Sequence, residues 1–209
     1  MLDCLVGSEM CIRDSLMSVM LSCTSNINWF INTFDSSIDE ISNYLKDSMS
    51  SDALMHNSPY YLPYLTGERT PLNDPHVRAS FHNMGIETDR KTLVFSLIEG
   101  ISFGLYDNYQ ALSKTGIELN NLFVIGGGSK NKDWIELLAS ILDRDLAITE
   151  ASDAMAAYGA ARLAYLGYNN LKHQDVLKSP SVKEIIKKNN NTKSMLQDRF
   201  VEWKKYYVN

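Results

Sequence analysis

Three consecutive glycines, Gly126, Gly127 and Gly128, constrain the fold of this chain more than any other feature of its sequence. The apolar, strand-forming residues 122–125 precede them, and the apolar positions of residues 131–142 that follow have helical spacing. The pattern predicts a strand, a tight turn and the start of a helix. A turn without side chains lets a ligand approach the backbone, and a helix start directs free N–H groups toward it. Phosphate or nucleotide is therefore the first ligand to consider, although such a turn also occurs without a ligand.

The glycines also form a near match to the dinucleotide-binding motif G-x-G-x-x-G, with Asn131 in place of the third glycine. Glu150 ends the next predicted strand, where an acid could bind ribose. The missing glycine removes the point at which helix and strand pack closely, and the unit comes late in the chain. An NAD-binding oxidoreductase is therefore the less favoured alternative.

The composition excludes several classes of protein. The hydrophobic content of 44% and the charged content of 22% are those of an ordinary globular protein, and the net charge of −5 disfavours general nucleic-acid binding. No apolar run reaches the roughly 18 residues of a membrane span. The 3 cysteines form no CxxC pair, which fits a reducing compartment, and the 4 histidines are scattered. We expect a cytoplasmic protein without nucleic-acid or membrane partners and without a protein-bound metal.

The rest of the chain alternates predicted helices and strands, an order that favours an α/β layer with parallel strands. Helices are predicted at 28–34, 38–49, 89–115, 131–142, 153–166 and 192–207, and strands at 16–22, 122–125 and 146–149. Ser152 or Asp153 can cap the helix that follows them, whose alanine-rich face is small enough to lie close on a sheet. In the longest helix, Gly100 and Gly104 permit close approach of another element. Residues 50–58 and 172–194 are predicted to be polar connections.

Residues 59–75 form a second unusual stretch, which contains the string YLPYLTGERTPLNDP. Its prolines and its glycine preclude a long regular element and predict an ordered loop. Arg69 could reach an anion, or Glu68 and Arg69 together could latch one domain onto another. From the residues alone, a solvated ion pair in a loop packed by its tyrosines is favoured.

Four strings together resemble the carboxy-terminal domain of the FGGY family of carbohydrate kinases, and most of all its xylulose-phosphorylating members. They are LMSVMLS at 16–22, YLPYLTGERTP at 61–71, Glu99-Gly100, and VIGGGS at 124–129. The resemblance implies an α/β fold of the actin-like, ribonuclease H-like ATPase type, incomplete at its amino-terminal strands. We expect residues 16–170 to form this partial domain and residues 171–209 to form a polar connection and a terminal helix. Residues 1–15 look like a translated sequencing adaptor, a non-native leader.

The resemblance also implies a nucleotide site with ATP and Mg²⁺ as cofactors. Gly126 and Gly127 would let the nucleotide lie against the backbone, Gly128 and Ser129 would extend that wall, and Asn131 would approach the adenine. The loop 81–85 corresponds to a segment that faces the phosphates. In this loop, Asn83 stands where the family pattern has glycine. In the helix that follows, Thr92 stands where the family prefers an acid, an amide or a histidine.

The implied activity is transfer of the γ-phosphate of ATP to D-xylulose, giving D-xylulose 5-phosphate. Ribulose, gluconate and glycerol are alternative substrates, and a non-enzymatic actin-like nucleotide-binding module is a further alternative. In the family, the aspartate base and most of the sugar site belong to an amino-terminal domain upstream of the matched strings. We therefore expect this chain of 209 residues to contain no catalytic residue and to be inactive alone. Sugar is expected to bind only through the missing domain. The sequence leaves open whether the protein forms a homodimer.

Overall fold

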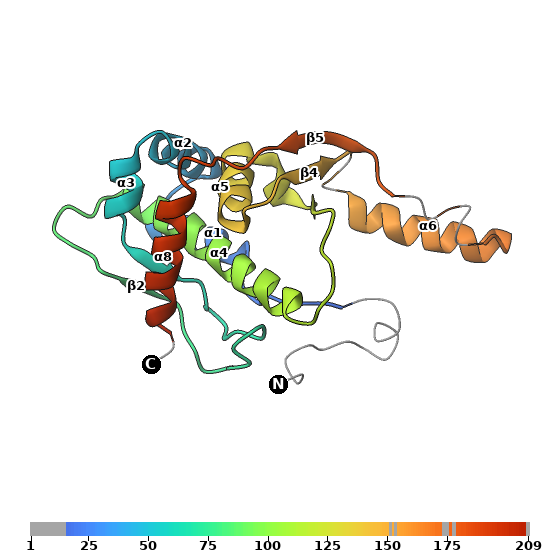
Figure 1. Cartoon of the computed structure of the whole chain (residues 1–209), viewed down its shortest axis with the longest axis horizontal. Coiled ribbons are helices and arrows are strands. Elements are labelled where there is room, and N and C mark those ends of the chain that lie inside the picture. The colour runs from blue at the N-terminus through green and yellow to red at the C-terminus, as the bar shows by residue number, and fades with distance from the viewer. Residues whose placement is uncertain (1–15, 151, 153, 173–175, 177–178, 208–209) are drawn as a thin grey trace.

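The computed structural model describes residues 16–150, 152, 154–172, 176 and 179–207, and the expected leader at 1–15 lies outside them. Helices pack around one long central helix, a small sheet lies beside them, and one further helix extends away from this body (Figure 1). In the described part of the chain, no helix is both long enough and apolar enough to cross a membrane.

The central helix is α4 (Arg90–Ser113). The sequence predicts that Asp89 caps its start, and the structure confirms this. The Asp89 side chain accepts a hydrogen bond from the Thr92 backbone N–H, and the Thr92 hydroxyl accepts one from the Asp89 backbone N–H. Every residue from Val94 to Gly104 is buried. This middle part of the helix is therefore enclosed on all sides, whereas its sequence predicts one apolar face.

The helices α1 (Ser25–Phe34), α2 (Ile38–Met49) and α5 (Lys132–Leu142) pack on α4, and all three predictions are confirmed, α2 with unchanged bounds. The predicted connection at 50–58 is wrong, because it contains the short helix α3 (Asp52–Asn57). The Ser51 side chain accepts the Leu54 N–H at the start of α3, and Met55 is fully buried. A cap and one buried side chain thus suffice to order a polar segment.

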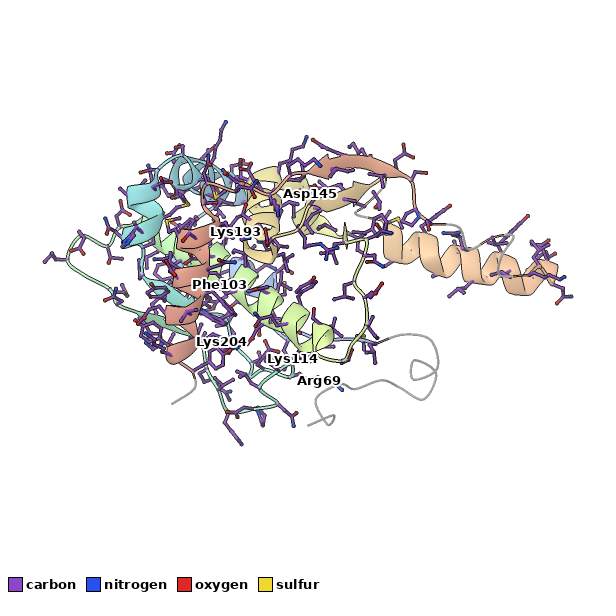
Figure 2. The ribbon with its side chains drawn as sticks, viewed as in Figure 1. Arg69, Phe103, Lys114, Asp145, Lys193 and Lys204 are labelled. Atoms are coloured by element: carbon purple, nitrogen blue, oxygen red, sulfur yellow. The ribbon has the colours of Figure 1, made fainter. Side chains whose placement is uncertain are left out.

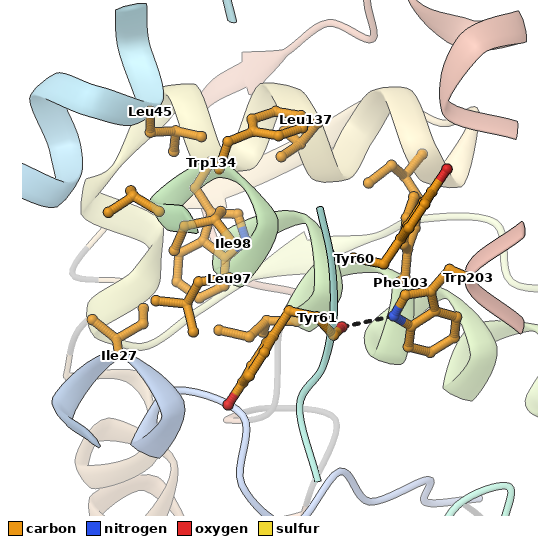
Figure 3. Close-up of a cluster of buried hydrophobic side chains, with 14 of the residues drawn as sticks. Ile27, Leu45, Tyr60, Tyr61, Leu97, Ile98, Phe103, Trp134, Leu137 and Trp203 are labelled. Atoms are coloured by element: carbon orange, nitrogen blue, oxygen red, sulfur yellow. Dashed lines mark hydrogen bonds between the residues drawn. The ribbon is translucent and has the colours of Figure 1, made fainter. Parts of the chain in front are cut away.

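Gly100 is the point of closest packing, as its sequence position predicts. A Cβ atom placed on Gly100 would lie 2.2 Å from the carbonyl oxygen of Tyr61, in the strand β1 (Tyr60–Leu62). The indole Nε1 of Trp203, in the terminal helix, donates to the same carbonyl at 2.7 Å (Figure 3). β1 thus lies between α4 and the end of the chain, and it pairs antiparallel with β2 (Ser80–His82).

The terminal helix α8 (Lys193–Lys205) belongs to the same core. From the sequence, Phe200, Val201 and Trp203 are expected to pack partly in this helix. Phe200 and Trp203 are buried, whereas the expectation for Val201 is wrong, since 62% of that residue is exposed. Lys193 and Lys204 lie at opposite ends of α8 (Figure 2). Each forms an ion pair at 2.7 Å, Lys193 with Asp143 and Lys204 with Asp107.

The second sheet has the order β3 (Phe123–Val124), β4 (Leu146–Thr149) and β5 (Val182–Ile186). β3 and β4 are parallel, as predicted, and β5 is antiparallel to β4. The prediction that 172–194 is only a connection is therefore wrong. The lysines beside the apolar residues of β5 make this stretch look polar, so the sequence does not predict a strand there. The stretch forms a strand because it pairs with the edge of β4.

The predicted strand at 16–22 is also wrong, because the proline-rich loop binds this segment through two side chains and one backbone hydrogen bond. The Leu21 N–H donates to the Glu68 carboxylate at 3.1 Å. Val19 donates its N–H to the Thr70 hydroxyl and accepts the Thr70 N–H, both at 3.2 Å. Glu68 is 3% exposed, so the expectation of a solvated Glu68–Arg69 pair is wrong as well.

The helix α6 (Met155–Asn169) forms where a helix is predicted, but neither of its predicted contacts is observed. It begins after Ala154, without a side-chain cap; the Ser152 hydroxyl instead contacts Ser129, and Asp153 lies outside the described residues. Among the residues that the structure describes in α6, Leu166 alone is buried. The helix extends away from the sheet rather than lying on it (Figure 1).

Candidate functional site

The glycine turn joins β3 to α5 as the sequence predicts, with one additional turn of 3₁₀ helix, η1 (Gly127–Lys130). Gly126 has φ of 91° and ψ of 178°, a conformation that is essentially restricted to glycine. Asn131 then caps α5 by accepting the Trp134 N–H at 3.0 Å. The backbone of the turn therefore explains the first glycine without reference to a ligand.

Gly126 and Ser129 hold the turn in place. The Gly126 N–H donates to the Ser152 carbonyl at 2.7 Å. The Ser129 hydroxyl, which is buried, donates to the Gly126 carbonyl at 2.7 Å and lies 2.7 Å from the Ser152 hydroxyl. These two predicted site residues therefore tie the turn to the segment after β4.

A cavity of about 500 Å³ lies on the other side of the turn. Three of the five predicted site residues line it: Gly127, Gly128 and Asn131. Most of the other lining residues come from α1, α2 and the residue before α1, and the full remainder is Thr24, Ile27, Asn28, Ile38, Asp39, Ile41, Ser42, Ile98, Lys130 and Trp134. The cavity thus combines apolar side chains with a similar number of polar ones, which a small-molecule ligand with an apolar body and polar groups could use.

Gly127 and Gly128 are glycines for different reasons. A Cβ atom on Gly127 would meet nothing within 4 Å, so its backbone borders open space that a ligand can approach. A Cβ atom on Gly128 would lie 2.9 Å from the ring of Trp134. The Trp134 indole is itself held by a hydrogen bond to the Ser102 hydroxyl at 3.0 Å. Gly128 therefore makes room for a buried side chain of the protein.

The Asn131 side chain spans two walls of the cavity. Its Oδ1 caps α5, and its Nδ2 donates to the Ser42 hydroxyl of α2 at 3.1 Å. Both ends of the amide are thus occupied by protein groups. The sequence predicts that Asn131 lies beside the ligand, and the structure adds its partner in α2.

The α2 wall was not predicted as part of the site. The spacing of Ile38, Ile41 and Leu45 predicts one packing face, and Ile41 and Leu45 are indeed buried. Ile38 is instead 58% exposed and lines the cavity with Asp39 and Ser42. Helical periodicity identifies an apolar face, but it does not show whether that face meets the core or a cleft.

The two departures from the family pattern have local backbone explanations. Asn83 has φ of 61°, in the left-handed region that asparagine tolerates better than most residues. Thr92 completes the cap of α4. Within the described chain, the 81–85 loop is not among the segments that line the 500 Å³ cavity. No group of three or more His, Cys, Asp or Glu side chains that could hold a metal ion occurs among the described residues.

Solved structures define the class of protein to which this fold and cleft belong. The crystal structure of a "xyloylose kinase" from Brucella ovis matches with a TM-score of 0.81 at 30% identity, covering 92% of this chain and 39% of that one. The crystal structure of Plasmodium falciparum glycerol kinase with ADP matches with a TM-score of 0.72 at 23% identity and covers 90% of this chain and 37% of that one. This likeness concerns the fold alone. The fold is the mixed α/β, actin-like ATPase fold of sugar kinases.

The chain belongs to the FGGY family of carbohydrate kinases, since the model of the C-terminal domain of that family matches residues 5–168. This match begins ahead of residue 16, where the resemblance in the sequence strings starts. The xylulose kinase of Staphylococcus xylosus is 33% identical over 152 residues, 73% of this chain and 31% of the relative. The xylulose kinase of Escherichia coli (strain K12) is 31% identical over 157 residues, which make up 75% of this chain and 32% of the relative. The chain spans about a third of the length of these curated relatives.

Proposed function

We propose that this chain is the nucleotide-binding part of an ATP-dependent carbohydrate kinase, and that the whole protein converts D-xylulose to D-xylulose 5-phosphate. The observation that carries the proposal is the 500 Å³ cavity beside the glycine turn, in a chain of the FGGY family. D-Xylulose is favoured because the two curated relatives described above are xylulose kinases. Glycerol, gluconate and ribulose are the alternative substrates.

The cavity suits the adenosine end of ATP. Its volume lies within the range of small-molecule sites, roughly 300–1,000 Å³. Ile38, Ile41 and Trp134 offer apolar surface, while the open backbone at Gly127 and the Asp39 carboxylate offer hydrogen-bonding groups. We assign Gly127, Gly128 and Asn131 to the wall that contacts the nucleotide, and Gly126 and Ser129 to its support. ATP-dependent transfer also uses Mg²⁺, which bridges the phosphates.

The buried acids of the sequence motifs support a division of labour in which this chain does not supply the base. Glu68 accepts the backbone N–H groups of Leu21 and Arg69, and Glu99 is paired with Arg199. Neither carboxylate is available to a sugar hydroxyl. Phosphoryl transfer depends on positioning and charge stabilisation, with an acid near the accepting hydroxyl, and we propose that this acid lies upstream, in the amino-terminal domain of the family.

Isothermal titration calorimetry on the 209-residue chain tests the nucleotide site. We expect saturable binding of ATP and ADP at a 1:1 ratio and no binding of NAD under the same conditions. Preferential binding of NAD would instead support the dinucleotide oxidoreductase, and failure to bind any adenine nucleotide would contradict the proposal.

A coupled assay of ADP release with D-xylulose and Mg·ATP tests the division of labour. We expect no turnover above the rate of protein-free controls, with D-xylulose, D-ribulose, gluconate or glycerol as acceptor. Robust turnover with any of these would show that this chain carries its own base. Binding without turnover is the combined result that the proposal requires.

A further inference from the structure

Ser42 and Asn131 form a hydrogen-bonded bridge between two elements that line the nucleotide cavity. Ser42 Oγ donates to the Ile38 carbonyl at 2.8 Å within α2 and accepts from Asn131 Nδ2 at 3.1 Å. Both residues line the cavity, Ser42 from α2 and Asn131 from the start of α5. The bridge therefore connects the glycine turn to α2 through side chains that also border the ligand space.

The cap of α5 determines which way the Asn131 amide points. Its Oδ1 accepts the Trp134 N–H at 3.0 Å, an interaction that an NH₂ group cannot make. Nδ2 must then face Ser42, which offers a lone pair there because its own proton is used by the Ile38 carbonyl. The two hydrogen bonds thus fix the Asn131 side chain in one orientation.

We propose that Ser42 is a positioning residue for nucleotide binding: its hydroxyl holds the Asn131 amide and fixes the spacing of α2 from the glycine turn. The inference rests on the proposed nucleotide site and assigns a role there to a residue in α2. Loss of the hydroxyl leaves Nδ2 without its partner in α2 and removes the hydrogen bond that joins α2 to the glycine turn. Ordering these groups again on binding has a cost, so Ser42→Ala weakens ATP binding about two- to tenfold, the range of one net hydrogen bond.

Calorimetric titration of the 209-residue chain with ATP tests this role in three variants. Ser42→Ala is expected to raise the dissociation constant by the factor above, and Ser42→Thr to restore it to within about twofold because the hydroxyl is kept. Ser113→Ala is the matched control, since the exposed Ser113 hydroxyl makes the same bond to a carbonyl four residues earlier, that of Tyr109, in α4. Thermal unfolding without nucleotide establishes that each variant is folded.

A double-substitution cycle separates positioning from general loosening of α2. Asn131→Ser keeps a side chain suited to cap α5 but cannot reach Ser42 with an amide. If Ser42 acts through Asn131, Ser42→Ala changes ATP affinity in the parent chain and not in the Asn131→Ser background. An equal loss of ATP affinity in both backgrounds, or an unchanged affinity in Ser42→Ala, would overturn the role of Ser42 and leave the proposed function standing. No ATP binding by the parent chain would overturn the proposed function, and this inference with it.

Discussion

Arg199 of α8 and Glu99 of α4 form a doubly hydrogen-bonded ion pair inside the core. Nε lies 2.6 Å from Oε1 and Nη2 lies 2.6 Å from Oε2. The guanidinium also donates to the carbonyls of His56 and Ser58 and lies 4.5 Å from the ring centroid of Tyr60. The side chains of Arg199 and Glu99 are only 5% and 1% exposed. Each charge is therefore stabilised by the other instead of by water. The pair attaches the terminal helix to the centre of the domain.

Arg199→Met should therefore destabilise the protein strongly, because it leaves the Glu99 carboxylate buried without a partner. We expect a loss of about 3–5 kcal/mol in the free energy of unfolding, measured by urea denaturation, and recovery of much of it in Glu99→Leu/Arg199→Met. Lys187→Met is the control, since it breaks the exposed pair with Asp145 and should cost less than about 1 kcal/mol. Similar losses for the two single variants would contradict the assignment.

Gly100→Ala should separate α4 from β1. The added methyl would lie 2.2 Å from the Tyr61 carbonyl oxygen, a backbone atom that cannot move alone. We expect a destabilisation of about 1–3 kcal/mol or more, seen as a lower thermal midpoint. Gly159→Ala, in α6, adds the same methyl where nothing lies within 4 Å, and it should instead stabilise by up to about 1 kcal/mol. A neutral Gly100→Ala would show that the two elements are less closely packed than described.

Gly126→Ala and Gly127→Ala should distinguish the contribution of the turn to the stability of the protein from its contribution to ATP binding. Gly126 has φ of 91°, so alanine there is strained, and we expect a loss of about 1–3 kcal/mol in the free energy of unfolding. Alanine at Gly127 has free space on the cavity side, so it should leave the free energy of unfolding nearly unchanged and weaken ATP binding. Calorimetry and urea denaturation on both variants check this. Unchanged ATP affinity in Gly127→Ala would argue against backbone contact at that residue.

Glu68 should make stability depend on pH. Burial raises the pKa of the Glu68 carboxyl above its ordinary value of 4.5, and the N–H groups of Arg69 and Leu21 oppose the rise only in part. Between 4.5 and the raised pKa the folded protein binds more protons than the unfolded chain, so stability falls as pH increases through this window. Glu68→Gln cannot titrate and should lack this fall.

The measurement is the difference in unfolding free energy between Glu68→Gln and the parent chain, from urea denaturation at a series of pH values from about 4 to 8. This difference should grow in favour of Glu68→Gln as pH rises through the window. Asp89, Asp143 and Asp145 have lowered pKa values because of their hydrogen bonds, but they titrate in both proteins and cancel. A constant difference would contradict a raised pKa at Glu68.

Local signals in the sequence predicted much of the domain. Asp89 caps α4, α2 has its predicted bounds, and the glycines join a strand to a helix. These features are decided within one or two turns of chain, through caps, periodicity and residues that permit unusual backbone angles. The strings of residues also identified the family. Within the site, they led to the glycine turn, three of whose predicted residues line the cavity.

The tertiary structure decided which partner each of these elements meets. The sequence shows that Ser42 lies on a helix and that Asn131 begins another, but the hydrogen bond between them joins positions 89 residues apart. It marks Glu68 as a charged loop residue, whereas burial against the 16–22 segment makes its carboxylate an internal acceptor. Periodicity and charge are properties of single segments, while a cleft and a buried ion pair require two segments that only folding brings together.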